Sequence, residues 1–539
     1  MVTRKKDRVS SDVILEAYER HDGNVRATAK ELGTGRWTVL RHVRSLGKGK
    51  EKPIAAGSLK GIEAETAALP KAGQVKRYIL TSAQNNTYVY DKVWENILAL
   101  AKYYKAEIMI GTYSYNQNAY GPADVKRGKA KVKDNNLWYD PKLEPYFCDI
   151  RKQLAKGLVW CGEYNALPTA VNPLAGLESY SGRKSAIFPH AKMAMRSIAT
   201  MQDAGTKLNF TTGTVTKVNY IQKRAGLIAE FHHVYGAVLV EVNEQGNWWV
   251  RQLNADAETG DIQDLDVLAQ NGVVTVGHRV ESITWGDLHS TFADETVVKI
   301  SLDMLDALQP KFQFMHDVLE GSSISPHIRD NPHVKFWTWL RGLHRVEEEF
   351  KRTAALMNRY DRPFVKTVVV DSNHDNPWIQ RWLREYDYRK DPANTRFFLK
   401  AQEYMYSQIE EHKKMPRDIN MTEWCLKRCG LSMHDSKFLI ADESFLICDD
   451  RIECGMHGHL GPGGRYGSPE NLSKMGRRCN IAHTHQAGIY DGLYMAGTSS
   501  KLRWDYNKGP SNWSNSHIVT YPNGKRAIIT IYAGSWRAQ

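Results

Sequence analysis

The chain has 539 residues, of which 42% are hydrophobic and 10% aromatic. This composition is that of a globular protein, and roughly 150 residues per domain predicts three or four domains. No apolar run approaches the ~18 residues of a membrane span, and the charged N-terminus lacks the apolar segment of a secretory signal. The sequence therefore predicts a soluble, cytoplasmic protein without a membrane span. The seven scattered cysteines lack zinc-ribbon or redox spacing and are expected to be reduced and mostly buried.

Positive charge is concentrated at the start of the chain. The net charge is +13, and residues 1–60 contain 14 Lys and Arg against 7 Asp and Glu, so about half of the excess lies there. This asymmetry favours a polyanionic partner near the N-terminus. A basic surface that serves only solubility is the alternative.

Residues 1–46 predict a small module of three helices. Ser10 or Ser11 can cap the first helix, Asn24 can cap the second, and Gly33 can end it. The third helix lies in GRWTVLRHVRSLG, and its predicted apolar face consists of Trp37, Leu40 and Val43.

The three predicted helices resemble a helix-turn-helix DNA-binding module. The tight turn after the second helix matches that motif, and the third helix would then contact DNA. Its candidate DNA-contacting residues lie off the apolar face and are Arg36, Arg41, His42 and Arg44. A three-helix module that docks another protein is the alternative.

Residues 47–75 are rich in Gly, Lys, Ala and Glu and predict a flexible linker. Further along the chain, residues 126–133 form a basic run. This run is suited to phosphate contact, and a solvated loop explains it at least as well.

Residues 76–270 predict an α/β domain of unknown role. Two strand-like segments, 77–83 and 106–111, flank a helix-like segment at 91–104, which is the pattern of a β–α–β unit. Residues 226–242 predict two further strands.

Residues 271–539 repeat one pattern, in which a short apolar strand is followed by acidic, amide or imidazole side chains. In α/β sheets the carboxyl ends of parallel strands share one edge, so loops that follow them converge. The side chains in these positions are, in chain order, Asp287 and His289, Asp317, Asn373 and His374, His457 and His459, and His483 and His485. Any one of these is a weak signal, whereas the ordered set is specific. Oxygen and imidazole ligands in this mixture suit Mn²⁺, Fe or Zn²⁺.

The ordered set resembles the signature of the calcineurin-like metallophosphoesterases, D-x-H, G-D, G-N-H-[DE], H and G-H-x-H, over about residues 275–500. It is most similar to the DNA-nuclease branch of that superfamily, and to the first-step DNA-transfer nucleases of tailed phages. The resemblance implies a β-sandwich flanked by helices, with two divalent metal ions, Mn²⁺ before Fe or Zn²⁺, at one edge.

The resemblance also implies a role for each matched residue. Asp287, His289 and His485 would hold one metal, while Asn373, His457 and His483 would hold the other. Asp317 would bridge the two metals and so take part in catalysis. His374 would not bind metal but would act as the general acid.

Three positions depart from the family pattern, which has glycine where this chain has His316, Ser372 and Ala482. These side chains fit if the local φ is negative. Three other residues lie close to the ligand positions. Asp371 and Asp375 can orient ligand histidines. Asp375 can alternatively hold His374 in one tautomer or, equally, cap a helix, and His459 can contact phosphate or serve only in its loop.

Two metals held in this way polarise the phosphoryl oxygens and activate a water, which is the chemistry of phosphodiester hydrolysis. The basic N-terminal module favours DNA as the substrate. The sequence thus predicts a metal-dependent DNA nuclease. A nucleotide phosphodiesterase or phosphatase, and a DNA-binding regulator with a scaffold phosphoesterase domain, are the alternatives. The family resemblance further implies a phage-encoded homo-oligomer that acts in DNA transfer or host DNA degradation, in the host cytoplasm.

Overall fold

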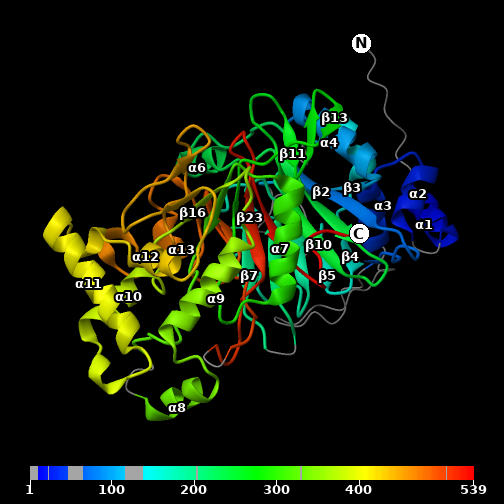
Figure 1. Ribbon diagram of the computed structural model, residues 1–539. Coiled ribbons are helices and arrows are strands. Elements are labelled where there is room, and N and C mark those ends of the chain that lie inside the picture. Colours follow the sequence, from blue (N-terminus) through cyan, green and yellow to red (C-terminus); the bar gives the residue numbers. More distant parts are fainter. Residues whose placement is uncertain are drawn as a thin grey trace.

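The computed structural model describes residues 10–21, 24–45, 65–115, 138–201, 204–327, 331–504 and 507–538 (Figure 1). These residues form a mixed α/β structure that contains several sheets.

The N-terminal residues fold as the predicted set of helices, α1 (Ser11–Arg20), α2 (Val25–Glu31) and α3 (Arg36–Ser45). The side chain of Asn24 caps α2 by accepting hydrogen bonds from two backbone N–H groups, each at 3.1 Å. Gly33 has φ +58° and ends the helix. The small core consists of Ile14, Ala29, Val39 and Val43. The predicted face of α3 was thus partly wrong, because Val39 is buried there while Trp37 turns toward the body of the protein.

The predicted β–α–β unit is confirmed. Strands β2 (Lys76–Gln84) and β3 (Glu107–Tyr113) are parallel, and α4 (Asp91–Tyr104) connects them. With β9 (Gly236–Val242) and β10 (Trp248–Asn254) they form a sheet of order β10-β9-β2-β3.

One of the two strands predicted in residues 226–242 is wrong. That segment begins within α6 (Arg224–Phe231), and only its second half is a strand, β9. The sequence LIAEF contains strong helix formers, so local propensity favours the helix over an apolar strand.

A small sheet covers α4. It consists of β11 (Ile262–Asp264), β12 (Val267–Gln270) and β13 (Val273–Val276). Ile262, Val267 and Ala269 from this sheet share a core with Trp94 and Ile97 of α4.

The largest sheet has 11 strands and crosses the predicted domain boundary at residue 270. Its strands, in spatial order, are β1 (Glu65–Thr66), β4 (Arg151–Ala155), β5 (Leu158–Cys161), β6 (Ser185–Phe188), β8 (Lys207–Thr211), β7 (Met195–Ile198), β21 (Gly488–Tyr490), β22 (Leu493–Met495), β20 (Arg478–Ile481), β19 (Ile452–Glu453) and β18 (Leu446–Ile447). The two halves join where β7 pairs antiparallel with β21. Strand β1 lies inside the predicted linker, so residues 65 and 66 are structured, while residues 46–64 lie outside the described residues.

The third large sheet has 6 strands in the order β17-β16-β15-β14-β23-β24. Strands β14 (Ser282–Thr284), β15 (Phe312–Met315), β16 (Lys366–Val369) and β17 (Ser436–Phe438) are parallel, and β23 (Ser516–Thr520) and β24 (Arg526–Thr530) continue the sheet antiparallel.

Alternate residues of this sheet face two different cores. Phe314 and Val368 pack with Ile447 and Ile452 of the largest sheet. Their neighbours Met315 and Val369 pack on the opposite side, in a core shared with helices. Those helices are α7 (Glu295–Leu308), α9 (Val346–Asn358), α10 (Asn376–Glu385), α11 (Thr395–His412) and α12 (Met421–Arg428), with α7 and α9 in front in Figure 1. Each large side chain buried in this way contributes about 1.5–3 kcal/mol.

The remaining helices are short. They are η2 (Pro141–Tyr146), α8 (Pro332–Leu340), η3 (Tyr388–Lys390), η4 (Pro416–Asp418), η5 (Pro462–Gly464) and α13 (Pro469–Leu472). Helix α8 lies between β15 and β16 in the sequence and projects at the lower edge of the molecule in Figure 1.

Candidate metal centre

The predicted ligands come from loops that follow five strands, β14, β15, β16, β19 and β20. Strands β14 to β16 are parallel neighbours, so their loops leave the same sheet edge. Strands β19 and β20 are parallel to each other in the sheet packed against it. The structure thereby brings all of the predicted ligands to one place.

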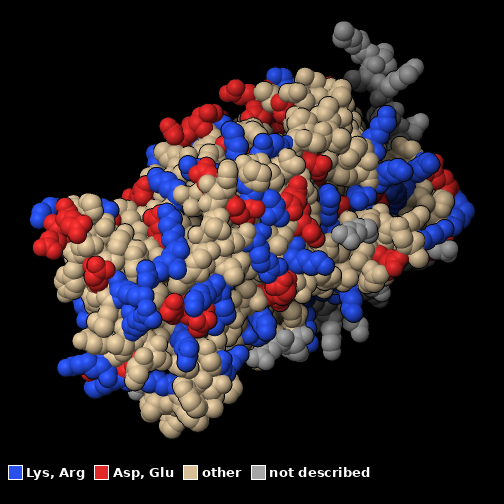
Figure 2. All heavy atoms as spheres, in the orientation of Figure 1, with Lys and Arg blue, Asp and Glu red and all other residues tan. Residues whose placement is uncertain are grey.

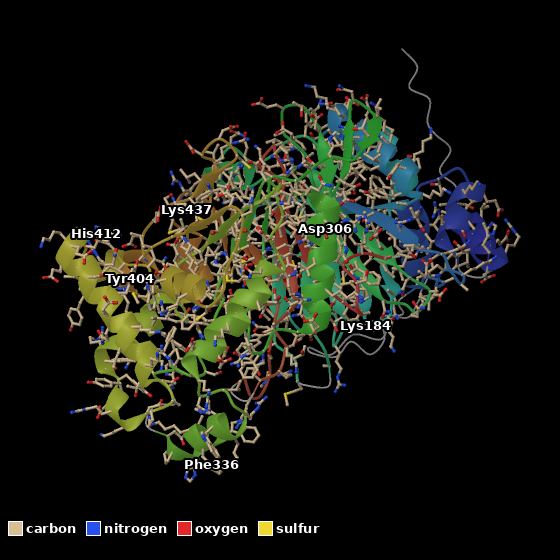
Figure 3. The ribbon with its side chains drawn as sticks, in the orientation of Figure 1. Lys184, Asp306, Phe336, Tyr404, His412 and Lys437 are labelled. Atoms are coloured by element: carbon tan, nitrogen blue, oxygen red, sulfur yellow. The ribbon has the colours of Figure 1, made fainter. Side chains whose placement is uncertain are left out.

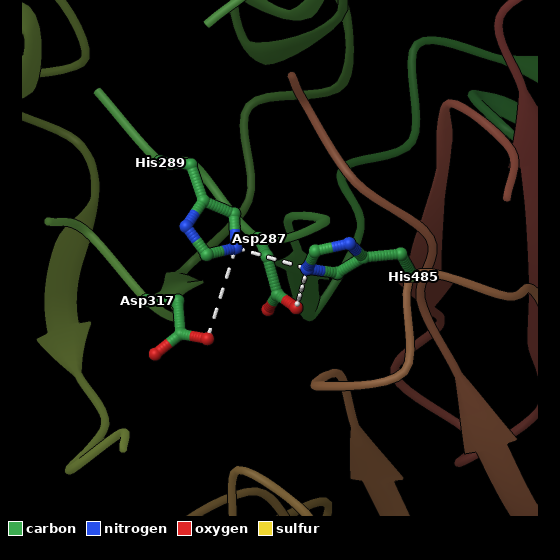
Figure 4. Close-up of side chains that lie close together, drawn as sticks. All are labelled: Asp287, His289, Asp317 and His485. Atoms are coloured by element: carbon green, nitrogen blue, oxygen red, sulfur yellow. Dashed lines mark hydrogen bonds and ion pairs between the residues drawn. The ribbon is translucent and has the colours of Figure 1, made fainter. Parts of the chain in front are cut away.

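The first group of side chains is Asp287, His289, Asp317 and His485 (Figure 4). All four are buried, and their candidate ligand atoms lie within 4.8 Å of one another. Nε2 of His485 lies 2.9 Å from Nε2 of His289 and 3.0 Å from Oδ2 of Asp287. Nε2 of His289 lies 3.8 Å from Oδ2 of Asp317.

The second group shares Asp317 with the first and adds His457 and His483. Nε2 of His457 lies 3.2 Å from Oδ2 of Asp317 and 3.1 Å from Oδ1 of Asn373. The predicted amide ligand therefore lies beside this group. Asp317 stands between the two groups, as a bridging carboxylate must.

The donor set fits a divalent cation. Both carboxylate oxygens of Asp287 are buried without a hydrogen-bond donor among the described residues, and the short contact to His485 lacks hydrogen-bond geometry. A buried carboxylate in this condition needs a counter-charge. The buried Asp and His side chains of the two groups provide oxygen and imidazole ligands, which suit Mn²⁺, Fe or Zn²⁺.

Burial sets the protonation of the cluster. It raises the pKa of Asp287 well above its usual range, and the charge of Asp317 raises that pKa further. Burial lowers the pKa of His289 and His457 well below the usual value, and it lowers the pKa of His483 and His485 to about 4. The imidazoles are therefore neutral at pH 7, which is the form that binds metal.

Four of the ligand residues have left-handed backbone. Their φ angles are +41° for His289, +38° for Asp317, +74° for His483 and +59° for His485. Such conformations cost about 1–3 kcal/mol each and concentrate at functional sites. The three residues that stand where the family has glycine do not have positive φ, as expected for residues that carry a side chain. They are His316, Ser372 and Ala482.

Two neighbouring side chains hold the loop that carries Asp317. Ser372 Oγ accepts a hydrogen bond from the N–H of Asp317 at 3.0 Å. The carboxylate of Asp375 accepts from the N–H groups of Val318 at 3.2 Å and Leu319 at 3.0 Å. The Asp375 side chain makes no capping hydrogen bond to α10, so the capping role predicted for it is wrong, and its hydrogen bonds go to the Asp317 loop. Its role is to anchor the loop.

The other two neighbours lie beside the cluster. Burial and the charge of Asp317 raise the pKa of Asp371 to about 7, and its Oδ1 has no hydrogen-bond partner among the described residues. The His459 ring centre lies 5.4 Å from that of His457 and 6.1 Å from that of His483. His459 thus lies next to the second group.

Two residues near the ligands were missed by sequence reasoning. Oε2 of the buried Glu320 lies 3.0 Å from Nδ1 of His289, and Glu320, His289 and His374 form a third group of side chains that could hold a metal ion. His316 stacks on His457 with ring centres 5.5 Å apart. Glu320 stands three residues after Asp317, so the acidic residue next to a ligand was the available signal.

His374 is held in a defined orientation. Its Nδ1 lies 2.8 Å from the carbonyl oxygen of Glu320, and its ring stacks on Trp378 with centres 4.0 Å apart. A carbonyl only accepts, so Nδ1 carries the proton and donates. Nε2 of His374 is thereby left for proton exchange.

A cleft of about 430 Å³ opens beside the two groups. Its walls include Asp317, Asn373 and His374 on one side and Tyr466 and Trp513 on the other. The Tyr466 hydroxyl lies 3.2 Å from Nε2 of His483. The cleft is large enough for a phosphate ester and its neighbouring groups to reach the cluster.

The predicted DNA-contacting residues lie far along the chain from this cleft. Arg36 donates a hydrogen bond to the carbonyl oxygen of Phe147, and Nε1 of Trp37 donates to Oδ2 of Asp149 at 2.6 Å. Helix α3 is thus anchored to the body of the protein at its N-terminal end. The side chains of Arg41, His42 and Arg44, and the basic run at 126–133, lie outside the described residues.

Among the residues that the structure describes, no helix has both the length and the apolar character to span a membrane.

Comparison with known proteins gives one informative relationship. No protein-family model matches the chain. The chain is 32% identical over 505 residues to Protein A1 of Escherichia phage T5, an alignment that covers 91% of this chain and 87% of that protein. The chain therefore belongs to the family of the phage T5 Protein A1.

Proposed function

We propose that this chain is a metal-dependent DNA nuclease of the calcineurin-like metallophosphoesterase superfamily. The observation that carries the proposal is the position of Asp317, whose buried carboxylate belongs to both ligand groups. The order of the ligands along the chain resembles that superfamily, and the two sheets packed face to face are compatible with its β-sandwich. The similarity to a phage T5 protein supports a phage origin.

The two groups are suited to two divalent ions, Mn²⁺ before Fe or Zn²⁺. Asp287, His289 and His485 would hold one ion, Asn373, His457 and His483 the other, and Asp317 both. When bound, such ions neutralise phosphate charge and lower the pKa of a water molecule, which makes that water a nucleophile at neutral pH.

The chain's own residues then orient the substrate and move protons. His374 lines the cleft with its Nδ1 proton held by the Glu320 carbonyl, so a ring that carries a second proton on Nε2 gives that proton to the leaving oxygen and keeps the one on Nδ1. Glu320 lies 3.0 Å from Nδ1 of His289, and Nδ1 of His316 lies 3.4 Å from Nδ1 of His457. Contacts of this kind fix the orientation and tautomer of metal-ligating histidines.

DNA is the substrate that the rest of the chain favours. Residues 1–60 have a net charge of +7, from 14 basic and 7 acidic residues, and include helices α1 to α3, which resemble a helix-turn-helix. Basic side chains on such a module bind phosphates in a salt-dependent manner. Family resemblance extends the proposal to a homo-oligomer that acts in the host cytoplasm, in DNA transfer or host DNA degradation.

A screen of metals against substrates tests the proposal. The chain is stripped with chelator, reloaded with Mn²⁺, Fe²⁺, Zn²⁺ or Mg²⁺, and assayed on single- and double-stranded DNA, on bis(p-nitrophenyl) phosphate and on a mononucleotide. We expect cleavage of DNA that depends on added metal. Faster turnover of the small diester than of DNA would support a nucleotide phosphodiesterase instead. Sequence-specific DNA binding without hydrolysis under any metal would support a DNA-binding regulator.

A further inference from the structure

Helix α8 exposes an unusual amount of apolar surface. Within its nine residues, Phe336, Trp337, Trp339 and Leu340 are between 51% and 60% exposed. Figure 3 places Phe336 at the lower tip of the molecule, pointing away from the body. Phe336 and Trp339 lie nearly parallel, with ring centres 5.8 Å apart and planes at 19°. An exposed set of rings on a single short helix marks a binding surface rather than a part of the core.

The surroundings of α8 are basic. Residues 331–346 contain Lys335, Arg341 and Arg345 and no Asp or Glu. The acidic residues that begin α9 are already engaged: Lys351 pairs with Glu347 and Glu348, and Glu349 accepts hydrogen bonds from Ser322 and Ser323. In Figure 2 the α8 projection is largely uncharged, with Lys and Arg side chains on the surface above it. The described face therefore combines aromatic rings with the side chains of Lys335, Arg341 and Arg345.

A continuous series of ring contacts connects α8 with the metal centre. The Arg341 guanidinium lies 5.4 Å from the ring centre of Trp337 and 6.0 Å from that of Phe292. Phe292 packs on Trp504 with centres 5.1 Å apart, and Trp504 packs on Trp513 at 5.3 Å.

The inner end of this series touches the ligands themselves. Trp504 lies 4.8 Å from the ring of His289, Trp513 lies 4.1 Å from the ring of His485, and Trp513 also lines the cleft. The exposed Lys501 adds positive charge beside Phe292, because the backbone N–H of Lys501 donates a hydrogen bond to the Phe292 carbonyl oxygen. The series therefore runs from the exposed rings of α8 to the wall of the cleft.

We propose that this aromatic track, formed by α8, Arg341, Phe292, Trp504 and Trp513, binds a single strand of DNA by stacking on its unpaired bases and leads its phosphates to the metal centre. Aromatic faces bind any unpaired base, whereas the bases of a duplex cover one another's faces. Positive charge along the track matches the phosphate backbone. The inference rests on the proposed nuclease function and specifies its substrate as a single strand or an unwound end.

Binding of an oligonucleotide in the presence of chelator tests this proposal. Fluorescence anisotropy of a labelled oligothymidine, and of a blunt duplex of matched length, is measured with the full chain, with Trp337→Ala and with Trp337→Phe. We expect Trp337→Ala to weaken single-strand binding about tenfold, because stacking of one base on one ring contributes a factor of at least that order. Trp337→Phe retains a ring face and should recover most of the affinity. The matched control is Tyr406→Ala, which removes an exposed ring from α11 and should bind like the unaltered chain.

Three results would overturn the proposal. One is equal single-strand affinity for the unaltered chain and Trp337→Ala. The second is a change of sedimentation mass in Trp337→Ala without a change in strand affinity, which would assign α8 to a contact between copies. The third is binding of anionic vesicles that depends on Trp337 while strand affinity does not. Because chelator prevents hydrolysis, a chain without nuclease activity can still pass this test, and an active nuclease can fail it.

Discussion

The hydroxyl of Ser372 accepts a hydrogen bond from the backbone N–H of Asp317 at 3.0 Å and donates one to the carbonyl oxygen of Val370 at 2.9 Å. Ser372 stands where the superfamily that this chain resembles has glycine, and Asp317 is the carboxylate shared by both ligand groups. The substitution adds a side-chain contact that holds Asp317 at φ +38°. In this chain, the Ser372 side chain therefore supports the backbone that carries Asp317.

Ser372→Ala should therefore damage the site and the fold together. The N–H of Asp317 would be left buried without a partner, which costs about 1–3 kcal/mol of unfolding free energy. Urea denaturation in chelator measures that loss, and metal titration should show weaker binding. Ser82→Ala is the control, since Ser82 is buried and donates to the Gly213 carbonyl oxygen, away from the ligands. Equal metal affinity in Ser372→Ala and Ser82→Ala would contradict the supporting role.

Glu320→Gln should weaken metal binding without unfolding the chain. The variant replaces the carboxyl group 3.0 Å from Nδ1 of His289 with an amide and keeps the size of the side chain. Loss of such a partner typically reduces metal affinity about 10–100-fold. Calorimetric titration of the stripped chain with Mn²⁺ measures the change, with Glu163→Gln, whose carboxylate pairs with Arg151, as the control. Unchanged affinity in Glu320→Gln would mean that this carboxylate does not orient His289.

His374→Ala should separate metal binding from turnover. His374 contributes a backbone N–H bond to Asp317, which the substitution keeps, so both ions should remain. Turnover on DNA should decrease about 10²–10⁴-fold, the usual contribution of a general acid. Elemental analysis and a DNA cleavage assay on the same preparation measure the two quantities. His412→Ala, at the exposed C-terminal end of α11 (Figure 3), is the control. Normal turnover by His374→Ala would remove His374 from the mechanism.

Stability without metal should decrease as the pH decreases below 6.5. Burial lowers the pKa of His517 to about 3, while its ring nitrogens contact the N–H of Gly286 at 2.9 Å and the hydroxyl of Ser301 at 3.0 Å. As the pH falls from 6.5 toward 3, the unfolded chain takes up a proton that the folded chain does not, so acid favours unfolding. From pH 7 to pH 5 this one group accounts for about 2 kcal/mol.

Urea denaturation at the two pH values checks this, with His517→Asn for comparison. Asn offers an acceptor to Gly286 but does not titrate. The loss of stability of His517→Asn between pH 7 and pH 5 should be smaller than that of the unaltered chain by about the same 2 kcal/mol. An identical loss in both chains would show that protonation of His517 does not contribute.

The clustering of the predicted ligand side chains could be expected because these residues follow strand ends in the sequence. Each apolar run that became β14, β15, β16, β19 or β20 is followed within a few residues by its polar cluster. Once the strands are aligned in parallel, their loops meet at one edge, whatever the rest of the fold does.

What could not be predicted depends on contacts between distant segments. The pairing of β7 with β21 joins residues almost three hundred apart and extends one sheet across the predicted boundary at residue 270. The contact of Trp37 with Asp149 likewise turns a residue of the expected helical core toward another part of the chain. The Glu320 carboxylate reaches His289 through folding, not through spacing. Local patterns contain no information about such partners.

The shared role of Asp317 is the centre of this account, and Asp317→Asn tests it most directly. The unaltered chain, Asp317→Asn and the exposed-surface control Asp303→Asn are loaded with Mn²⁺, freed of excess metal, and analysed for metal content and DNA cleavage. We predict metal bound and DNA cleaved by the unaltered chain and by Asp303→Asn, and reduced metal content with loss of cleavage in Asp317→Asn. Full metal content and undiminished DNA cleavage in Asp317→Asn would contradict the account.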